Sequence, residues 1–406
     1  MTASSLAAAH QFEFGISQQI RAESNIFGDS PEKAIADGVY VLMPRVEVSG
    51  RIGEFEGGRY SLAYRPSYLF YFISDDVDGL DNRASADLEF TLTPADRLRA
   101  NASYVEYNSV QAISQENPDG GFDVLPEDRG ETIRALGNIT YSREQTRKSR
   151  FSVDFNFQDY SYPESRNVGN KSIAASGSYT QAISPRLTLG AGLTARYRIF
   201  ADQPQYGVGS STVTVANLNI LGSYALSRTL SFEFMGGPSL IRTEPGAVVG
   251  AETPPSGSDL TYFMNLLLNL SRKDSDYRAS YRRDEDASGG SNRTSVADTF
   301  SGSARLRIDE LWRVGGNIGW NRRQTVDSYI YTDGQGNQLP FSQVSQLDRA
   351  WVGLTATRLL GERFLLTIGF RYQRWLDYVV GGVQRPTQDN FTGSLRLDYE
   401  FDPIAF

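Results

Sequence analysis

The final segment of the chain alternates strictly between apolar and polar side chains. Polar residues take every second position from Thr392 to Glu400, and the positions between them form an apolar face. Successive side chains of a β-strand point to opposite sides, so this pattern predicts a strand with one apolar and one polar face. Such a strand near a C-terminal aromatic residue is typical of an outer-membrane β-barrel. We expect these residues to close the barrel and take part in its assembly: Phe391, Leu395, Leu397, Tyr399, Phe401 and Phe406.

The same alternation recurs in about 18 segments, each near the roughly 9–11 residues with which a tilted strand crosses a bilayer. It is clear at residues 12–20, 40–48, 60–72 and 364–372, and weakest around Ile173 and Tyr277. The sequence therefore predicts an all-β fold, a transmembrane antiparallel up-and-down β-barrel of about 18 strands, within a range of about 16 to 20.

Short and long connections alternate between these segments. Pro94–Asp96 and Ser184–Arg186 are short turns, whereas Gln111–Gly130 and Thr325–Gln346 are the longest polar links. Outer-membrane barrels have short periplasmic turns and long extracellular loops, which places both termini on the periplasmic side. A barrel of this size leaves an aqueous lumen unless something fills it, and the two longest links are the candidates to fold inward.

A soluble β-sandwich could also bury an apolar face of each strand, but about 18 long strands would have to share its core without a visible linker. Closure into a barrel also removes exposed strand edges. We therefore expect one barrel domain over residues 11–406. Residues 1–10 include Ser4–Ala9, which resembles the end of a secretory signal, and form a signal-peptide remnant or a disordered tail.

Composition adds constraints on compartment and chemistry. No run approaches the roughly 20 apolar residues of a spanning helix, as expected for strands that alternate, and the absence of cysteine fits an oxidising periplasmic route. The single histidine, His10, lies at the N-terminus, so catalysis by a histidine-activated nucleophile is excluded. The net charge of −8 and the lack of a basic patch exclude nucleic-acid binding. We expect neither an enzyme nor a cofactor or metal site.

The polar face of the strands is rich in arginine and acidic residues. Charges on the lipid side would cost a few kcal/mol each at mid-membrane, so their shared parity predicts that they face the lumen. They either line a path for anions or acidic sugars, or form a cross-strand lattice that only braces the wall. The charged lumen-lining candidates are Arg45, Arg65, Arg97, Arg99, Arg134, Arg196, Arg198, Arg278, Arg305, Arg307, Arg371, Arg396, Glu47, Glu89, Asp154 and Glu233.

Aromatic residues fall into two groups by parity. Tyr71, Trp351 and Trp375 share the polar face and are further lumen-lining candidates. Such rings would suit a sugar track, because sugars pack their CH faces on aromatic planes, or they would pack beneath inward-folded loops. Trp312 and Trp320 share the apolar face, where amphipathic rings form a girdle at the headgroup level.

Short motifs in the first hundred residues add a family resemblance. They are Glu23-Ser24-Asn25-Ile26-Phe27, Met43-Pro44, Tyr64-Arg65-Pro66-Ser67-Tyr68 and the Asn82 that precedes the fourth strand. With them the chain resembles the outer-membrane β-barrel porins associated with bacterial exopolysaccharide export systems. The resemblance is diffuse, and no binding residue is carried over from it. It implies a channel that takes part in the export of a secreted polysaccharide together with a periplasmic polysaccharide-export protein.

Two other functions stay open from the sequence. One is a diffusion porin for small anionic or sugar solutes, and the other is a closed structural or binding barrel. In each case we expect the bacterial outer membrane as the location. The expected partners are its lipid and lipopolysaccharide, the barrel-assembly machinery, and a polysaccharide or small solute.

Overall fold

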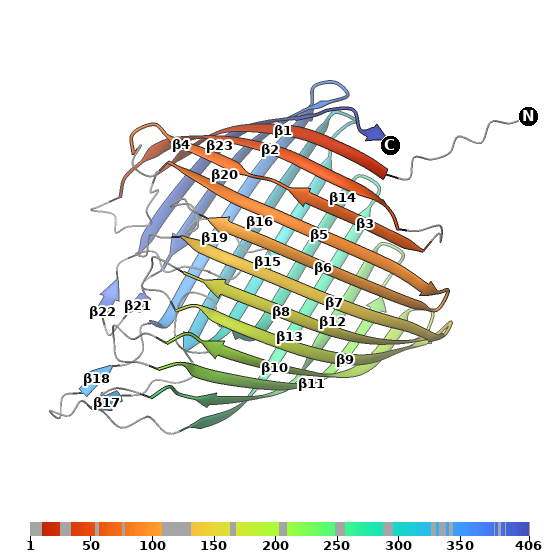
Figure 1. Cartoon of the computed structure of the whole chain (residues 1–406), viewed down its shortest axis with the longest axis vertical. Helices are drawn as coiled ribbons and strands as arrows, with labels where there is room; N and C mark the ends of the chain where they lie inside the picture. The colour runs from red at the N-terminus through yellow and green to blue at the C-terminus, as the bar shows by residue number, and fades with distance from the viewer. Residues whose placement is uncertain are drawn as a thin grey trace, which may run out of the picture.

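The computed structural model describes residues 10–24, 34–52, 57–74, 78–107, 131–162, 168–202, 209–247, 256–286, 295–325, 330–332, 338–340, 344–376, 378–380, 383–385 and 387–405. Its strands form a tilted, closed wall (Figure 1). Their bounds are β1 (His10–Glu23), β2 (Asp37–Arg51), β3 (Gly58–Tyr64), β4 (Ser67–Tyr71), β5 (Gly79–Thr93), β6 (Asp96–Tyr107), β7 (Thr132–Thr146), β8 (Ser149–Ser161), β9 (Asn170–Ser184), β10 (Leu187–Phe200), β11 (Ser211–Ala225), β12 (Leu230–Glu244), β13 (Gly257–Arg272), β14 (Ser275–Asp286), β15 (Ser295–Arg307), β16 (Trp312–Thr325), β17 (Ile330–Thr332), β18 (Gln338–Pro340), β19 (Val344–Leu359), β20 (Phe364–Trp375), β21 (Tyr378–Val380), β22 (Val383–Arg385), β23 (Gln388–Glu400) and β24 (Ile404–Ala405).

The wall is an antiparallel barrel of 18 strands, as the alternation predicts. Each long strand pairs with its neighbours in chain order, and β1 pairs with both β2 and β23, which closes the ring. The weakly patterned segments around Ile173 and Tyr277 form the full-length strands β9 and β14. Within the described residues, no helix has the length and apolar character needed to cross a membrane.

The pairing register sorts the side chains into two faces. Phe12 stands opposite Val48 on one face, and Glu13 stands opposite Glu47 on the other. Large apolar side chains such as Leu395 and Ile368, paired in register on β23 and β20, are about half exposed on the outer face. An apolar surface of this extent around a whole barrel is the surface of a transmembrane protein.

The parity assignment gives a direct test on the last strand. Leu395→Arg places a charge on the lipid side and is expected to lower the free energy of unfolding in bilayers by about 2–4 kcal/mol. Ser394→Arg, one residue away on the lumen side, should change it by less than about 1 kcal/mol. Equal losses in the two variants, measured by urea unfolding in vesicles, would contradict the assignment.

Aromatic and charged rows mark the borders of the apolar band. Tyr281, Phe300 and Trp320 stand in register on β14, β15 and β16. Trp312 lies eight residues from Trp320 on the same strand, which is about 26 Å at a rise of about 3.3 Å per residue. At a strand tilt of about 40° this span corresponds to about 20 Å across the membrane, slightly less than the roughly 25 Å height of a barrel's apolar band.

An outer charge row lies in register just beyond the first aromatic row. It consists of Arg283, Asp298, Arg322 and Asp348 on four neighbouring strands. Arg283 pairs with Asp298 at 2.7 Å and Arg322 pairs with Asp348 at 2.9 Å. Each arginine therefore has its own carboxylate where the wall leaves the apolar band.

The third strand of the wall differs from the sequence prediction of one continuous segment over residues 60–72. It is interrupted at Arg65 and Pro66, between β3 and β4. Proline has no N–H and cannot donate to a ladder, and Pro44 of β2 lies opposite the interruption. Two prolines that face each other across neighbouring strands therefore break the ladder at this point.

Candidate functional site

A pocket lies in the wall where the ladder is broken. Pairing between β2 and the third strand stops at Val46 and Tyr64 and resumes at Leu42 and Tyr68. On the side of β5 the third strand stays attached at the interruption, because the Arg65 N–H donates to the Arg83 carbonyl at 2.8 Å. The gap and the adjoining strands enclose a cavity of about 450 Å³, which we call the seam pocket because β23 and β1 close the barrel beside it.

The seam pocket is lined by more cationic than acidic side chains. The charged residues in its lining are Arg45, Arg65, Arg83, Arg363, Arg396, Glu362, Asp398 and Glu400. Five of these are arginines and three are acids, so the lining carries a net positive charge of two. In the described part of the chain, no cluster of His, Cys, Asp and Glu side chains could hold a metal ion.

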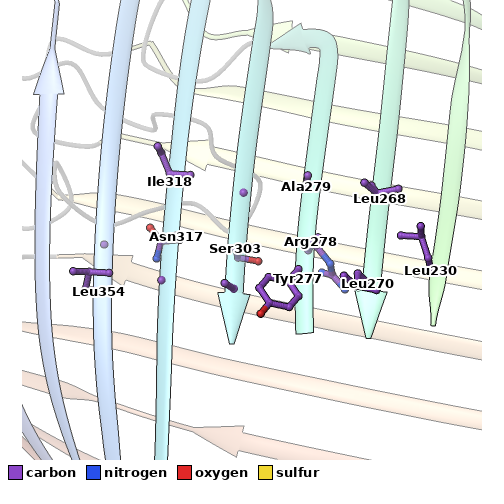
Figure 2. A pocket seen from close by; sticks show the side chains of 14 residues that line it. Leu230, Leu268, Leu270, Tyr277, Arg278, Ala279, Ser303, Asn317, Ile318 and Leu354 are labelled. Atoms are coloured by element: carbon purple, nitrogen blue, oxygen red, sulfur yellow. The ribbon is translucent and has the colours of Figure 1, made fainter. Parts of the chain in front are cut away.

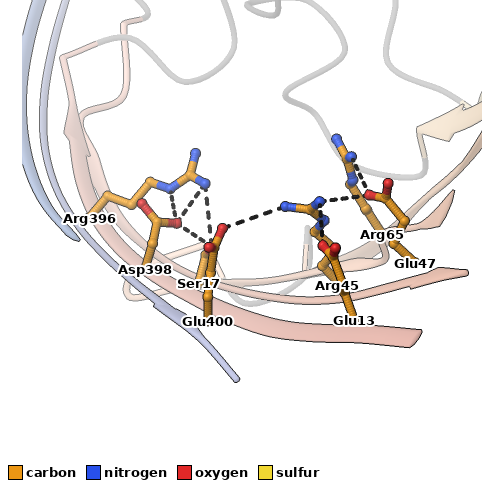
Figure 3. Close-up of polar contacts among 8 residues, drawn as sticks. All are labelled: Glu13, Ser17, Arg45, Glu47, Arg65, Arg396, Asp398 and Glu400. Carbon is orange, nitrogen blue, oxygen red and sulfur yellow. Dashed lines mark hydrogen bonds and ion pairs between the residues drawn. The ribbon is translucent and has the colours of Figure 1, made fainter. Parts of the chain in front are cut away.

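Arg45 is the centre of a charged lattice on one side of the pocket. Figure 3 shows it between three carboxylates on the inner side of the wall. Its guanidinium lies 2.6 Å from Glu47, and 3.7 Å from both Glu13 and Glu400. Arg65 approaches Glu47 at 3.7 Å. The lattice joins β1, β2, β23 and the end of β3, and so braces the closing strands.

Arg396 belongs to a second, smaller group on β23 and β1. Its guanidinium lies 2.6 Å from Asp398 and donates to the Ser17 hydroxyl at 3.3 Å, while that hydroxyl donates to Asp398. The side chains of Arg65 and Arg396 are 53% and 45% exposed. Ion pairs this exposed contribute little stability, so an incoming anion can replace their carboxylate partners at small cost.

The solvent exposure of the inner-face side chains changes along the barrel axis. We call the side with short turns the turn end, and the side with long connections the loop end. Inner-face residues near the turn end, such as Arg97 and Arg305, are exposed, whereas Arg134, Arg349 and Trp375 near the loop end are buried. The lumen wall is therefore open to solvent at the turn end and covered at the loop end.

Contacts near the loop end join strands that are far apart in the wall. Glu285 of β14 pairs with Arg196 at 2.6 Å and also with Arg198, both on β10, although β11, β12 and β13 lie between these strands. Val39 and Leu69 on β2 and β4 share an apolar cluster with Tyr160 and Tyr162 at the end of β8. These contacts join side chains of strands that are not neighbours in the wall, and we call them the loop-end layer.

Trp351 and Trp375 lie at the same end of the barrel, on the neighbouring strands β19 and β20. The guanidinium of Arg349 lies 5.4 Å from the ring centre of Trp351 and 5.6 Å from that of Trp375, within the range of a cation–π contact. Trp351 packs against Gly319 on β16, where an added Cβ would lie 2.0 Å from the indole. Only glycine leaves room for this ring.

This close approach predicts the effect of one added methyl group. Gly319→Ala is expected to lower the free energy of unfolding by about 1–3 kcal/mol, because the indole must move out of its packed position. Gly393→Ala is the matched control, since an added Cβ there meets nothing within 4 Å. Urea unfolding followed by tryptophan fluorescence measures both, and equal stability of the two variants would refute the packing argument.

The register places the predicted lumen-lining residues on the inner parity of their strands, and the structure divides them among three regions. Arg45, Arg65 and Arg396 line the seam pocket, with Glu47 beside them. Tyr71, Arg134, Arg196, Arg198, Arg371, Trp351 and Trp375 lie toward the loop end. The rest are spread along the wall: Arg97, Arg99, Arg278, Arg305, Arg307, Glu89, Asp154 and Glu233.

The predicted closing strand is β23, which pairs with β1. Phe401, just after it, packs against Phe14 with ring centres 4.9 Å apart. Phe406 and the link Gln111–Gly130 lie outside the described residues, as does most of Thr325–Gln346.

Several site residues were missed by the sequence reasoning. Arg83, Arg323 and Arg349 have the inner parity and could have been found by the same rule. Glu285 has the outer parity of its strand, so only the fold brings it to Arg198. Arg363 belongs to the short turn before β20 and no periodicity indicates its position.

Solved structures resemble this chain, whereas no family model and no curated protein matches its sequence. The outer membrane protein opdK from Pseudomonas aeruginosa is 9% identical, with a TM-score of 0.46, over 97% of this chain and 99% of that one. The FrpB iron transporter from Neisseria meningitidis (F5-1 variant) is 9% identical, with a TM-score of 0.48, over 96% and 81%. The siderophore receptor PirA from Pseudomonas aeruginosa is 11% identical, with a TM-score of 0.45, over 95% and 80%.

Proposed function

We propose that this protein is an outer-membrane channel for an acidic polysaccharide, which it passes to the cell exterior together with a periplasmic partner. The observation that carries the proposal is the seam pocket, in which five arginines line one cavity of the lumen wall. The sequence motifs around Met43-Pro44 and Tyr64-Arg65-Pro66-Ser67-Tyr68, which carry the resemblance to export-associated porins, meet at this pocket.

The chemistry of the pocket favours a ligand with repeated carboxylates. A guanidinium binds a carboxylate through two parallel N–H donors, which gives both affinity and orientation. Arg65 and Arg396 each present an exposed guanidinium from a different strand. A chain of uronic acids carries a carboxylate on each sugar. As the chain moves, a carboxylate can therefore leave one arginine and bind the next.

The loop-end layer gives this channel a closed resting state. The buried Glu285 bridge and the apolar cluster around Tyr160 tie non-neighbouring strands together at the end where a polysaccharide would leave. A permanently open lumen would expose the cell to small solutes, whereas a covered exit opens only when these contacts separate. We place the turn end, with both termini, on the periplasmic side.

Binding of defined oligosaccharides tests the proposal. Calorimetry with the purified full chain in detergent should show that an oligoguluronate binds at least about tenfold more tightly than a glucose oligomer of the same length, and that salt weakens the difference. Equal affinities, or binding that salt does not change, would overturn the assignment of an acidic saccharide.

A diffusion porin for small anions is the second candidate. It is favoured by the exposed inner-face arginines near the turn end, such as Arg97, Arg99 and Arg307. Deletion of the gene separates the two functions. The export proposal predicts loss of surface polysaccharide with little change in nutrient uptake, and the porin predicts the reverse.

A further inference from the structure

A groove crosses the outer, lipid-facing surface of the barrel nearer the turn end. It encloses about 500 Å³ and is framed by large apolar side chains from β12, β13, β14, β16 and β19 (Figure 2). These are Leu230, Leu268, Leu270, Tyr277, Ile318 and Leu354. Its walls therefore match the hydrocarbon part of a bilayer.

The floor of the groove exists because small residues meet in register. Ala279 stands opposite Gly302 on the next strand, and Ala304 stands opposite Gly316 on the strand after that. At Gly302 even an added Cβ would lie 3.3 Å from the Ile318 side chain. Any longer side chain at these four positions would fill the groove.

A cationic rim lies at the turn end of the same surface. Arg228 and the pair Arg272 and Lys273 belong to two turns that the Ser271 N–H to Thr229 carbonyl bond, of 2.8 Å, holds side by side. All three cations are exposed, and within the described residues none of them forms an ion pair. Asp274 lies in the second of these turns, and the Arg307 N–H to Asp274 carbonyl bond holds it beside the next turn, which carries Asp309 and Glu310. None of these acids forms an ion pair with the three cations, so the cations can bind an external anion.

The rim is continuous with the groove. Leu230 and Leu270, which frame the groove, stand opposite each other in register directly next to the two turns. The outer charge row at the loop end differs from the rim, because there each arginine has a carboxylate partner. Unmatched positive charge beside an apolar groove is complementary to a lipid with an anionic headgroup.

We propose that the groove and the cationic rim form a binding site for an anionic phospholipid of the turn-side leaflet. Its phosphate lies at Arg228, Arg272 and Lys273, and one of its acyl chains fills the groove over Ala279 and Ala304. The lipid site requires only the transmembrane fold, so a test of it does not depend on the transport proposal.

The protein contains its own reporter for this lipid. Trp312 and Trp320 lie on the outer face of β16, on either side of Gly316 and Ile318 in the groove. The other two tryptophans, Trp351 and Trp375, are buried on the inner face. Bromine atoms on acyl chains quench tryptophan fluorescence on contact, so in the turn-side leaflet they report on Trp312, whereas Trp320 at the loop-end border reports on the other leaflet.

The test compares two brominated lipids in vesicles that contain the full-length chain. Quenching at equal mole fractions of the two lipids gives the ratio of their apparent affinities for the site. This ratio should favour brominated phosphatidylglycerol over brominated phosphatidylcholine about fivefold. Arg272→Gln with Lys273→Gln should bring this ratio close to one. Arg147→Gln with Lys148→Gln, which removes the same two charges from the turn between β7 and β8, should leave it unchanged.

A second pair of variants tests the groove without changing the charge of the protein. Ala304→Leu should lower quenching by brominated phosphatidylglycerol, whereas Ala86→Leu on the outer face of β5 should not. Three results would overturn the proposal: a ratio of one in the unmodified protein, an equal fall in both charge variants, or quenching that Ala304→Leu does not alter.

Discussion

Replacing Glu285 with alanine is expected to lower the free energy of unfolding by about 3–5 kcal/mol, the largest loss among the substitutions considered. The carboxylate is almost fully buried and accepts from both Arg196 and Arg198. Its removal takes the counter-charge from the Arg198 guanidinium, whose side chain is only 5% exposed, and an unpaired buried charge is far more costly than a missing pair. Urea unfolding in vesicles, followed by tryptophan fluorescence, measures this loss.

Two further variants separate a charge effect from loss of packing. Glu233→Ala removes a carboxylate from an exposed position of the inner face and should change stability by less than about 0.5 kcal/mol. Adding Arg196→Met and Arg198→Met to Glu285→Ala should recover most of the lost stability, because apolar side chains of similar length need no counter-charge. If the triple variant is no more stable than Glu285→Ala, the explanation by unpaired charge is wrong.

The second large effect concerns the seam pocket. Arg65→Gln with Arg396→Gln should weaken binding of an acidic oligosaccharide at least about tenfold, since each charge-assisted hydrogen bond to a carboxylate contributes about 1.5–3 kcal/mol. The fold should be retained, because both side chains are about half exposed and their ion pairs add little stability. Calorimetry with the same ligand measures the affinity change.

A matched control removes two arginines of the inner face that do not line the pocket. Arg305→Gln with Arg307→Gln takes the same charge from exposed positions of β15. These changes should weaken binding by less than about threefold, through the loss of long-range attraction alone. Equal losses in the two double variants would mean that the ligand senses the net charge of the lumen and that the pocket has no special role.

Much of this fold follows from a period of two. Strand number, pairing order and the face of each side chain depend on local alternation, which the sequence displays directly, as in the strict pattern of β23. The break between β3 and β4 could not be predicted in the same way. Pro66 alone is tolerated in a strand, and the break needs Pro44 opposite it, which only the register reveals.

The functional site was accessible to sequence reasoning in part. Parity indicated that Arg45, Arg65 and Arg396 share the inner face, but not that they line a common cavity, because that depends on how β23 meets β1. The bridge from Glu285 to Arg198 contradicts the parity of β14 and joins the end of this strand to β10. Contacts between strands that are four apart in the wall have no signature in local sequence.

The most direct test of a lumen closed at the loop end is single-channel recording of the purified, refolded protein in a planar bilayer. We predict that the unmodified protein, shown to be folded and inserted, stays closed or opens only briefly. The Glu285→Ala variant should show anion-selective openings, because the bridge to Arg196 and Arg198 is absent. Steady nanosiemens steps from the unmodified protein would contradict the closed state and favour a diffusion porin.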